Sequence, residues 1–145
     1  MLINSPSFSV LYSIEEAIKA YRKLSQRNIS KLVPGITVDQ ALILIILNER
    51  PELTQSEVAD LVFKDYASMN RILNLMISKN YIRKTTNKED KRRAKISITK
   101  TGKAIIEKLT PAIQVNRETA LQNISQEEIS TLFTILKRIT HNCKS

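Results

Sequence analysis

The stretch that decides the fold is DYASMNRILNLMISKN (residues 65–80) followed by YIRKTTNKEDKRRAKISITKTGK (residues 81–103). In its first part, apolar residues recur at helical spacing, and Asp65 can cap the first turn. The stripe that should face the core consists of Met69, Ile72, Leu73 and Met76. We therefore predict a helix from Asp65 to about Lys79, ended by Asn80 in a left-handed conformation.

The second part predicts a β-hairpin with a charged tip. Residues 82–86 and 94–99 alternate apolar and polar side chains, as half-buried strands do, and Asn87–Arg93 would connect them. The chain has 23 Lys and Arg and 14 acidic residues. Ten of the basic and two of the acidic residues lie between Lys79 and Lys103, which leaves 13 basic and 12 acidic residues elsewhere. A polyanion-binding site concentrates positive charge in this way. On charge alone, a solvated loop is an equally good interpretation.

Helix signals flank this stretch on both sides. Residues 8–29 carry an apolar stripe at helical spacing, and Val33-Pro34-Gly35 should end that helix. Three capping boxes predict helix starts, because a Ser or Thr and a Glu or Gln three residues later satisfy each other's backbone N–H groups. They are Thr37–Gln40 before a helix over 38–48, Thr54–Glu57 before one over 55–62, and Ser125–Glu128 before the last helix. Another helix should follow Thr101, with Pro111 kinking or restarting it.

Each of these helices has an apolar side. The side chains predicted to face inward are Leu11, Ile14, Ile18 and Tyr21; Val58, Ala59 and Leu61; Ala104, Ile105, Leu109, Ala112 and Ile113; and Ile129, Leu132, Phe133, Leu136 and Ile139. The chain should thus be mainly α with a small β-hairpin, in one unit spanning residues 1–145. The order helix, helix, helix, strand, strand over residues 37–100 is that of a winged helix-turn-helix.

Composition limits the class of protein. The single cysteine, Cys143, rules out a disulfide framework within one chain and fits a reducing cytoplasm. The N-terminus has no signal-peptide pattern, and the longest apolar run, Ala41–Leu47, is far shorter than the roughly 20 residues that span a bilayer. We expect a soluble, cytoplasmic protein with no membrane partner.

The sequence contains no catalytic or metal-binding pattern. It has no G-x-S-x-G, Walker or H-E-x-x-H motif. His141 and Cys143 stand two residues apart near the end, without the second pair that a metal site needs. We therefore predict that the chain is not an enzyme, and that it has no catalytic residues, no metal and no cofactor.

The predicted helix and hairpin tip suit a DNA duplex. Ser68, Asn70 and Arg71 lie away from the apolar stripe, and such side chains reach base edges and phosphates in the major groove. Arg71 could contact guanine or a phosphate, and Asn70 could pair with adenine. At the tip, Arg92 could enter the minor groove, with Asp90 fixing the direction of its guanidinium. An ordinary amphipathic helix and a solvated charged turn are the alternatives.

Two apolar-striped helical arms, residues 7–32 and 101–142, flank this lobe. In a monomer they would leave apolar surface exposed. Pairing across a two-fold axis would bury that surface and place two reading helices one or more DNA turns apart. The arms could instead fold back on their own core.

The sequence resembles the MarR family of bacterial transcriptional regulators over nearly its whole length. The motifs are LTQSEVA (residues 53–59), Asp65–Asn74, and Asp90-Lys91-Arg92 followed by ISITKTG (residues 96–102), which is similar to the family's wing signature of D-x-R and then L-T-x-x-G. The resemblance implies a homodimer, joined through its first and last helices, that binds an operator. Family members often repress transcription and are released by small phenolic or other aromatic ligands, which bind between the dimer arms and the DNA-binding lobe.

The resemblance and the residue chemistry together give the predicted sites. Recognition-helix contacts are expected from Ala67, Ser68, Asn70, Arg71 and Asn74, and wing contacts from Lys88, Asp90, Lys91, Arg92, Arg93 and Lys95. Phe8, Leu11, Tyr12, Ile14 and Tyr21 could line an effector pocket, although such an apolar face is more often plain core. Three positions depart from the family pattern: Ala67 replaces a frequent serine, Leu75 a charged residue and Asn80 a glycine.

We expect a sequence-specific, double-stranded DNA-binding transcriptional regulator. It would act as a homodimer on a pseudo-palindromic operator, as a ligand-responsive repressor. Two alternatives remain. The winged helix could bind an acidic protein partner, or the chain could be an architectural DNA binder that is indifferent to sequence.

Overall fold

The computed structural model describes residues 5–90 and 93–145, so Lys91 and Arg92 of the predicted wing lie outside the described residues. After a 3₁₀ turn at Pro6–Phe8, the elements are α1 (Val10–Leu32), α2 (Val38–Glu49), α3 (Gln55–Leu61), α4 (Tyr66–Ser78), β1 (Ile82–Thr85), β2 (Lys95–Ile98), α5 (Lys100–Ala120) and α6 (Gln126–Lys144). This order confirms the predicted fold, which is mainly helical with one antiparallel hairpin.

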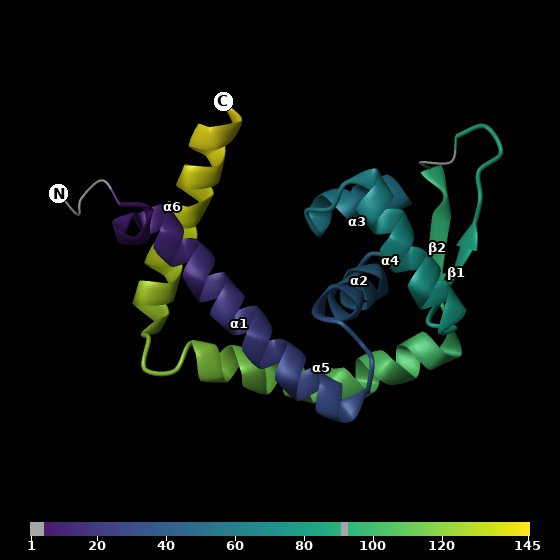
Figure 1. The fold of residues 1–145 in the computed structure, drawn as a ribbon, viewed down its shortest axis with the longest axis horizontal. Helices are drawn as coiled ribbons and strands as arrows, with labels where there is room; N and C mark the ends of the chain where they lie inside the picture. Colours follow the sequence, from purple (N-terminus) through teal and green to yellow (C-terminus); the bar gives the residue numbers. More distant parts are fainter. Residues whose placement is uncertain (1–4, 91–92) are drawn as a thin grey trace.

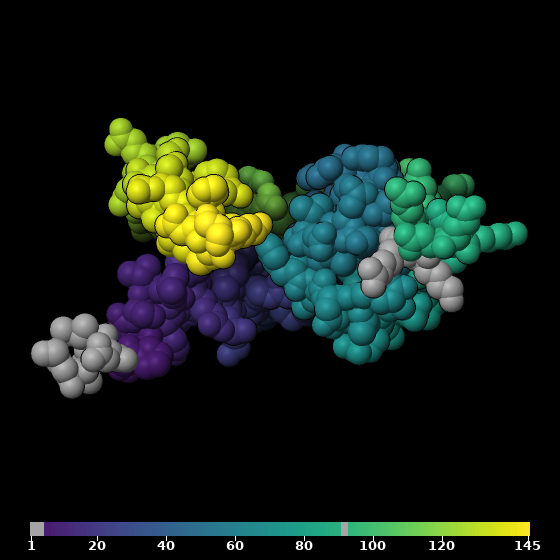
Figure 2. Space-filling view, turned by 90° about the horizontal axis from the view of Figure 1, so that it is seen from above, coloured from purple at the N-terminus to yellow at the C-terminus, as the bar shows by residue number. Residues whose placement is uncertain are grey.

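The elements form a lobe and an arm. Figure 1 shows α2, α3, α4 and the hairpin together on one side, while α5 runs beneath them and continues to the other side, where α1 packs across it. From above, α1 and α6 form one mass and the lobe another (Figure 2). The core lies in the lobe and continues to the crossing of α1 and α5; its fully buried side chains include Ile43, Leu44, Leu47, Met69, Leu73, Met76, Ile82, Ile96, Ile29 and Leu109.

Local capping fixes where the helices begin. The three capping boxes are formed in full, at Thr37 with Gln40, Thr54 with Glu57, and Ser125 with Glu128. Asp65 caps α4 as predicted, and Asn80 follows that helix with φ +61°. The entry to α2 is also bound to α1, because Gln26 of α1 donates to the Ile36 carbonyl (2.8 Å) and accepts from the Val38 N–H (2.9 Å).

The hairpin is joined to α5 without a loop. Ile82 pairs with Ile98 in register, and Thr99 directly caps α5 by accepting from the Gly102 N–H. Gly102 is buried where α5 passes the end of β1. A methyl group there would overlap the Tyr81 carbonyl oxygen and lie 2.7 Å from Ile98 Cγ2. Only a residue without a Cβ fits this junction.

Two details of the predicted inward faces are wrong, and of the two outcomes expected at Pro111 one is excluded. Leu61 is 42% exposed, and Val62 takes its place in the core because α3 ends there. Ala104 is exposed, since the core face of α5 follows Gly102, Ile105 and Leu109. Finally, α5 does not restart at Pro111. The proline lies on an exposed face, so water can hydrate the Glu107 carbonyl that loses its helical N–H partner.

The predicted inward face of α6 is also wrong for a single chain. No described residue of α6 is buried; Leu132 and Phe133 are 49% and 62% exposed, and Ile129, Leu136 and Ile139 are only half-buried. The stripe of α1 is similarly open at Leu11 and Ile18. The alternative in which α6 folds back on its own core is therefore contradicted. In the described part of the chain, no helix combines the length and apolar character needed to cross a membrane.

Candidate nucleic-acid interface

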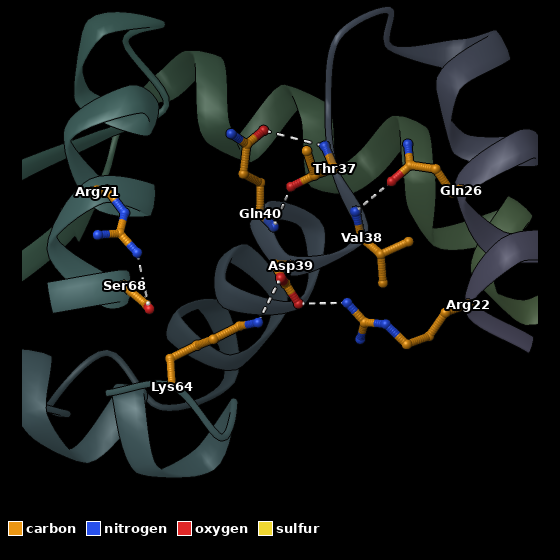
Figure 3. Close-up of polar contacts among 9 residues, drawn as sticks. All are labelled: Arg22, Gln26, Thr37, Val38, Asp39, Gln40, Lys64, Ser68 and Arg71. Carbon is orange, nitrogen blue, oxygen red and sulfur yellow. Dashed lines mark hydrogen bonds and ion pairs between the residues drawn. The ribbon is translucent and has the colours of Figure 1, made fainter. Parts of the chain in front are cut away.

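The exposed face of α4 carries the predicted reading residues. Ala67, Arg71 and Asn74 are exposed on the side opposite the buried Met69, Leu73 and Met76. Ser68 is half-buried beside them, and its Oγ lies 3.2 Å from Arg71 Nη2 (Figure 3). The Asp65 carboxylate accepts from the Ser68 N–H at 2.7 Å, and this bond lowers the carboxyl pKa. This bond stabilises the first turn of α4.

Asn70 lies on the flank of α4 that is turned toward α3 and the hairpin. Its Oδ1 accepts from Gln55 Nε2 (2.9 Å) and from Lys84 Nζ (3.3 Å). Gln55 is completely buried, and its backbone N–H also donates to the Ala94 carbonyl beside β2. Asn70 and Gln55 together therefore connect α4 and α3 to both sides of the hairpin, at Lys84 of β1 and at Ala94 just before β2.

The hairpin presents cations on both sides of its described tip. Lys88, Arg93 and Lys95 are exposed, as is Arg83 of β1. An Asx turn shapes the tip, since Asn87 Oδ1 accepts from the N–H groups of Glu89 (2.9 Å) and Asp90 (3.3 Å). The predicted pairing of Asp90 with Arg92 falls outside the described residues, as does the role of Lys91.

A groove of about 660 Å³ separates this lobe from the arm. Its lining comes from both sides and includes Tyr21, Arg22 and Ile29 of α1, Asp39 and Leu42 of α2, Phe63 and Lys64 of the α3–α4 turn, and Ile113 and Arg117 of α5. Of the five residues predicted for an effector pocket, Tyr21 lines it. Phe8, Leu11, Tyr12 and Ile14 lie nearer the N-terminus, outside the groove, and all but Ile14 are exposed.

Comparison with known proteins identifies the arrangement. A sequence profile of the MarR family matches residues 35–93, from the entry of α2 to the wing. The chain is 25% identical over 105 residues to the HTH-type transcriptional regulator BilQ of Clostridium symbiosum, covering 72% of this chain and 73% of BilQ. The winged helix-turn-helix lobe of this chain is thus similar to that of the MarR-family transcriptional regulators.

Solved structures show the same MarR fold. The S. aureus MepR–DNA complex superposes with a TM-score of 0.81 at 20% identity, covering 93% of this chain and 98% of MepR. The PcaV regulator from Streptomyces coelicolor, in complex with its natural ligand, gives a TM-score of 0.80 at 18% identity, with 94% and 95% covered. At these identities the likeness establishes the fold, and the roles of individual residues are argued from this chain.

Sequence reasoning missed two parts of this candidate site. Gln55 was identified only as the first residue of a helix and as part of the LTQSEVA motif, and Lys84 only as part of the basic stretch. No pattern in the sequence pairs them with Asn70, which lies 15 and 14 residues away. The other omission is Asp39 at the base of the groove, whose Oδ1 lies 2.7 Å from Arg22 Nη2 and whose Oδ2 lies 3.2 Å from Lys64 Nζ (Figure 3).

Asp39 connects the arm to the turn that precedes α4. Arg22 belongs to α1, and Lys64 immediately precedes Asp65, the N-cap of α4. Burial by itself would raise the pKa of Asp39, but the hydrogen bonds and charges of Arg22 and Lys64 outweigh it and lower the pKa below its ordinary 3.8. Because the folded state holds the ionised form, this contribution to stability is present above pH 3.8 and is lost as the pH falls through the lowered pKa.

Replacing Asp39 by Asn should lower the free energy of unfolding at about pH 7 by about 1 kcal/mol, a modest value because the side chains remain partly hydrated. The difference from the unaltered protein should shrink as the pH falls from 3.8 through the lowered pKa of folded Asp39, where its carboxyl becomes protonated. Urea unfolding at several pH values measures it. Glu52→Gln, in the exposed pair with Arg50, is the matched control and should change stability by only a few tenths of a kcal/mol. An equal effect of the two substitutions would contradict the assignment.

Proposed function

We propose that this chain is a member of the MarR family, and that it is a cytoplasmic, ligand-responsive repressor that acts as a homodimer on a pseudo-palindromic DNA operator. The observation that carries the proposal is the exposed polar face of α4 beside a cationic hairpin. Residues 37–100 would form the DNA-binding lobe, and residues 7–32 with 101–142 the dimerisation region.

The geometry of the lobe supports sequence-specific binding. Arg71 and Asn74 project from an exposed face of α4, and a major groove is wide enough to admit an α-helix. Ala67 on the same face leaves room for close approach. The exposed hairpin cations Lys88, Arg93 and Lys95 would then meet phosphates at the side of that groove. Lys91 and Arg92 are proposed wing contacts on sequence grounds.

The open apolar faces of the arm support the homodimer. Along α6 and the first half of α1, large apolar side chains lie exposed at helical spacing, among them Leu11, Ile18, Leu132 and Phe133. Monomeric proteins rarely expose such continuous apolar faces. A two-fold arrangement would bury the faces against each other and present two copies of α4 to one duplex.

The groove supports response to a small molecule. Its volume of about 660 Å³ is that of typical ligand sites. Tyr21 and Phe63 provide aromatic surface, and Phe63 is 91% exposed in a left-handed backbone conformation (φ +60°). Lys19, Arg22, Lys64 and Arg117 outnumber Asp39 along the lining, which favours an acidic aromatic compound. Such a compound would compete with Asp39 for Arg22 and Lys64, and thereby loosen the connection between arm and reading helix.

Selection of bound fragments from a random duplex pool, at about 150 mM salt, tests the proposal. We expect a pseudo-palindrome with half-sites about one helical turn apart. The logarithm of affinity should fall with the logarithm of salt concentration, with a slope of about −0.9 for each phosphate neutralised. Uniform binding without enrichment would indicate an architectural DNA binder. Absence of binding would favour the acidic protein partner.

A further inference from the structure

The contacts of Asn70 determine which end of its amide faces outward. The side-chain oxygen and nitrogen of an asparagine are told apart by their hydrogen-bond partners. Lys84 Nζ can only donate, so the Asn70 atom 3.3 Å from it must be the oxygen. The same oxygen lies 2.9 Å from the Gln55 side chain, which must therefore turn its NH₂ group toward it. With the amides reversed, an ammonium and an NH₂ group would face each other.

The oxygen of Asn70 has no capacity left for DNA. A carbonyl oxygen has two lone pairs, and Gln55 and Lys84 each occupy one. Gln55 is fully buried, so it cannot swing away without opening the contact between α3 and α4. Asn70 Nδ2 has no protein partner in the part of the chain that the structure describes, and the residue is partly exposed. Asn70 thus presents two N–H donors and no acceptor.

This orientation selects among base edges in the major groove. The bidentate contact of asparagine with adenine needs both the oxygen, to accept from N6, and the NH₂, to donate to N7. A donor-only amide can make half of that contact, and it places its second N–H against the adenine amino group. Guanine instead offers two adjacent acceptors, N7 and O6. The adenine contact that the sequence suggested for Asn70 is therefore excluded in this arrangement.

We propose that Gln55 and Lys84 are positioning residues that hold the Asn70 amide with its NH₂ group outward, so that Asn70 reads guanine in preference to adenine. The inference rests on the proposed function, since it needs α4 to lie in the major groove. Neither positioning residue has to touch a base. Their effect is on base preference at one position of each half-site, and it is separate from the general attraction of the hairpin for phosphate.

The test compares operators that differ at one base pair. Selection with the Asn70→Ala variant first locates the base pair whose preference depends on Asn70. Affinities of the unaltered protein are then measured for the selected operator with guanine or adenine at that position in both half-sites. We expect guanine to be favoured by about tenfold per contact, the middle of the range for a specific base contact.

Lys84→Met and Lys88→Met form a matched pair, because each removes one lysine charge from the hairpin. Lys88 is exposed at the tip and is not a partner of Asn70. Lys84→Met frees the two amides to reverse together, so guanine and adenine should become equal to within about twofold. Lys88→Met should weaken binding to both operators alike and leave their ratio unchanged. If Lys84 had only a structural role, Lys84→Met would likewise lower the affinity for both operators equally.

Gln55→Glu provides an opposite test. A carboxylate at this first position of α3 can only accept, and it would draw the Asn70 NH₂ inward and leave the oxygen outward. The preference should then shift toward adenine, and if the variant does not fold, Lys84→Met decides. Three results would each overturn the inference while the proposed function stands. The unaltered protein could prefer adenine at the Asn70-dependent position, no position could depend on Asn70, or the ratio of guanine to adenine affinities could be the same for Lys84→Met and Lys88→Met. If the unaltered protein selects no operator, the proposed function fails and the inference fails with it.

Discussion

Replacing Leu132 and Phe133 together by glutamate should convert the protein to a monomer and lower its affinity for a two-site operator by about 10²–10³-fold. These two side chains are 49% and 62% exposed in the single chain, on a helix without a buried residue. In the proposed dimer they lie within an apolar interface, where two carboxylates per chain would lose hydration without gaining a partner. Each lobe would then bind its half-site alone, without the high effective concentration that the second lobe supplies.

Thr131→Glu with Thr134→Glu is the matched control. Both threonines are exposed on α6, and at 100° per residue they point away from the Leu132–Phe133 side. This variant adds the same charge to the same helix and should remain dimeric. Sedimentation gives the oligomeric state, and titration with the operator and with a single half-site gives the affinities. A Leu132/Phe133 variant that stays dimeric, or that binds the operator normally as a monomer, would contradict this role of α6.

Replacing Gly102 by alanine should reduce the free energy of unfolding by about 3 kcal/mol. The added methyl group would overlap the backbone carbonyl of Tyr81 and press on Ile98, and neither can withdraw easily because both belong to the hairpin junction. The Thr99 N–H also bonds the same carbonyl at 3.1 Å, so moving it would break a second contact. The wing would be displaced relative to α5, and DNA binding should weaken as well.

Gly35→Ala is the control for Gly102→Ala, because it measures the cost of an unfavourable backbone conformation without steric overlap. Gly35 has φ +86°, which disfavours alanine, but its surroundings are open and the nearest atom to an added methyl is Lys79 Nζ at 3.7 Å. The expected loss is about 1 kcal/mol. Thermal or urea unfolding of the three proteins at one protein concentration makes the comparison, since a dimer's stability depends on concentration. Equal losses at the two glycines would mean that the Gly102 junction can relax.

Features set by residues close in sequence could be predicted from the sequence. The capping boxes at Thr37, Thr54 and Ser125 each depend on two residues three apart, and all three helices begin where these boxes place them. The alternation of apolar and polar residues also predicts the two strands, whose register in the structure pairs Ile82 with Ile98. The face of α4 could likewise be predicted, since its apolar stripe leaves Arg71 and Asn74 outward.

Features set by distant residues could not be predicted in this way. The stripe of α6 was recognised correctly as apolar, but whether it faces a core or another chain depends on the path of α5 and the turn after it. The orientation of Asn70 depends on Gln55 and Lys84, and the ion pairs of Asp39 join three separate elements. Periodicity describes one element at a time, so it carries no signal for these contacts.

The direct joining of β2 to α5 has a consequence for the operator. Thr99 is the single residue between the end of β2 and the start of α5, so no loop separates the wing from a helix of 21 residues. At 1.5 Å per residue this helix is about 31 Å long, close to one turn of DNA. In the proposed dimer, the separation of the two half-sites is therefore encoded in a helix length. A different half-site spacing would require a change of conformation at the C-terminal end of α5, in the Leu121–Ser125 turn, where Asn123 adopts φ +63°.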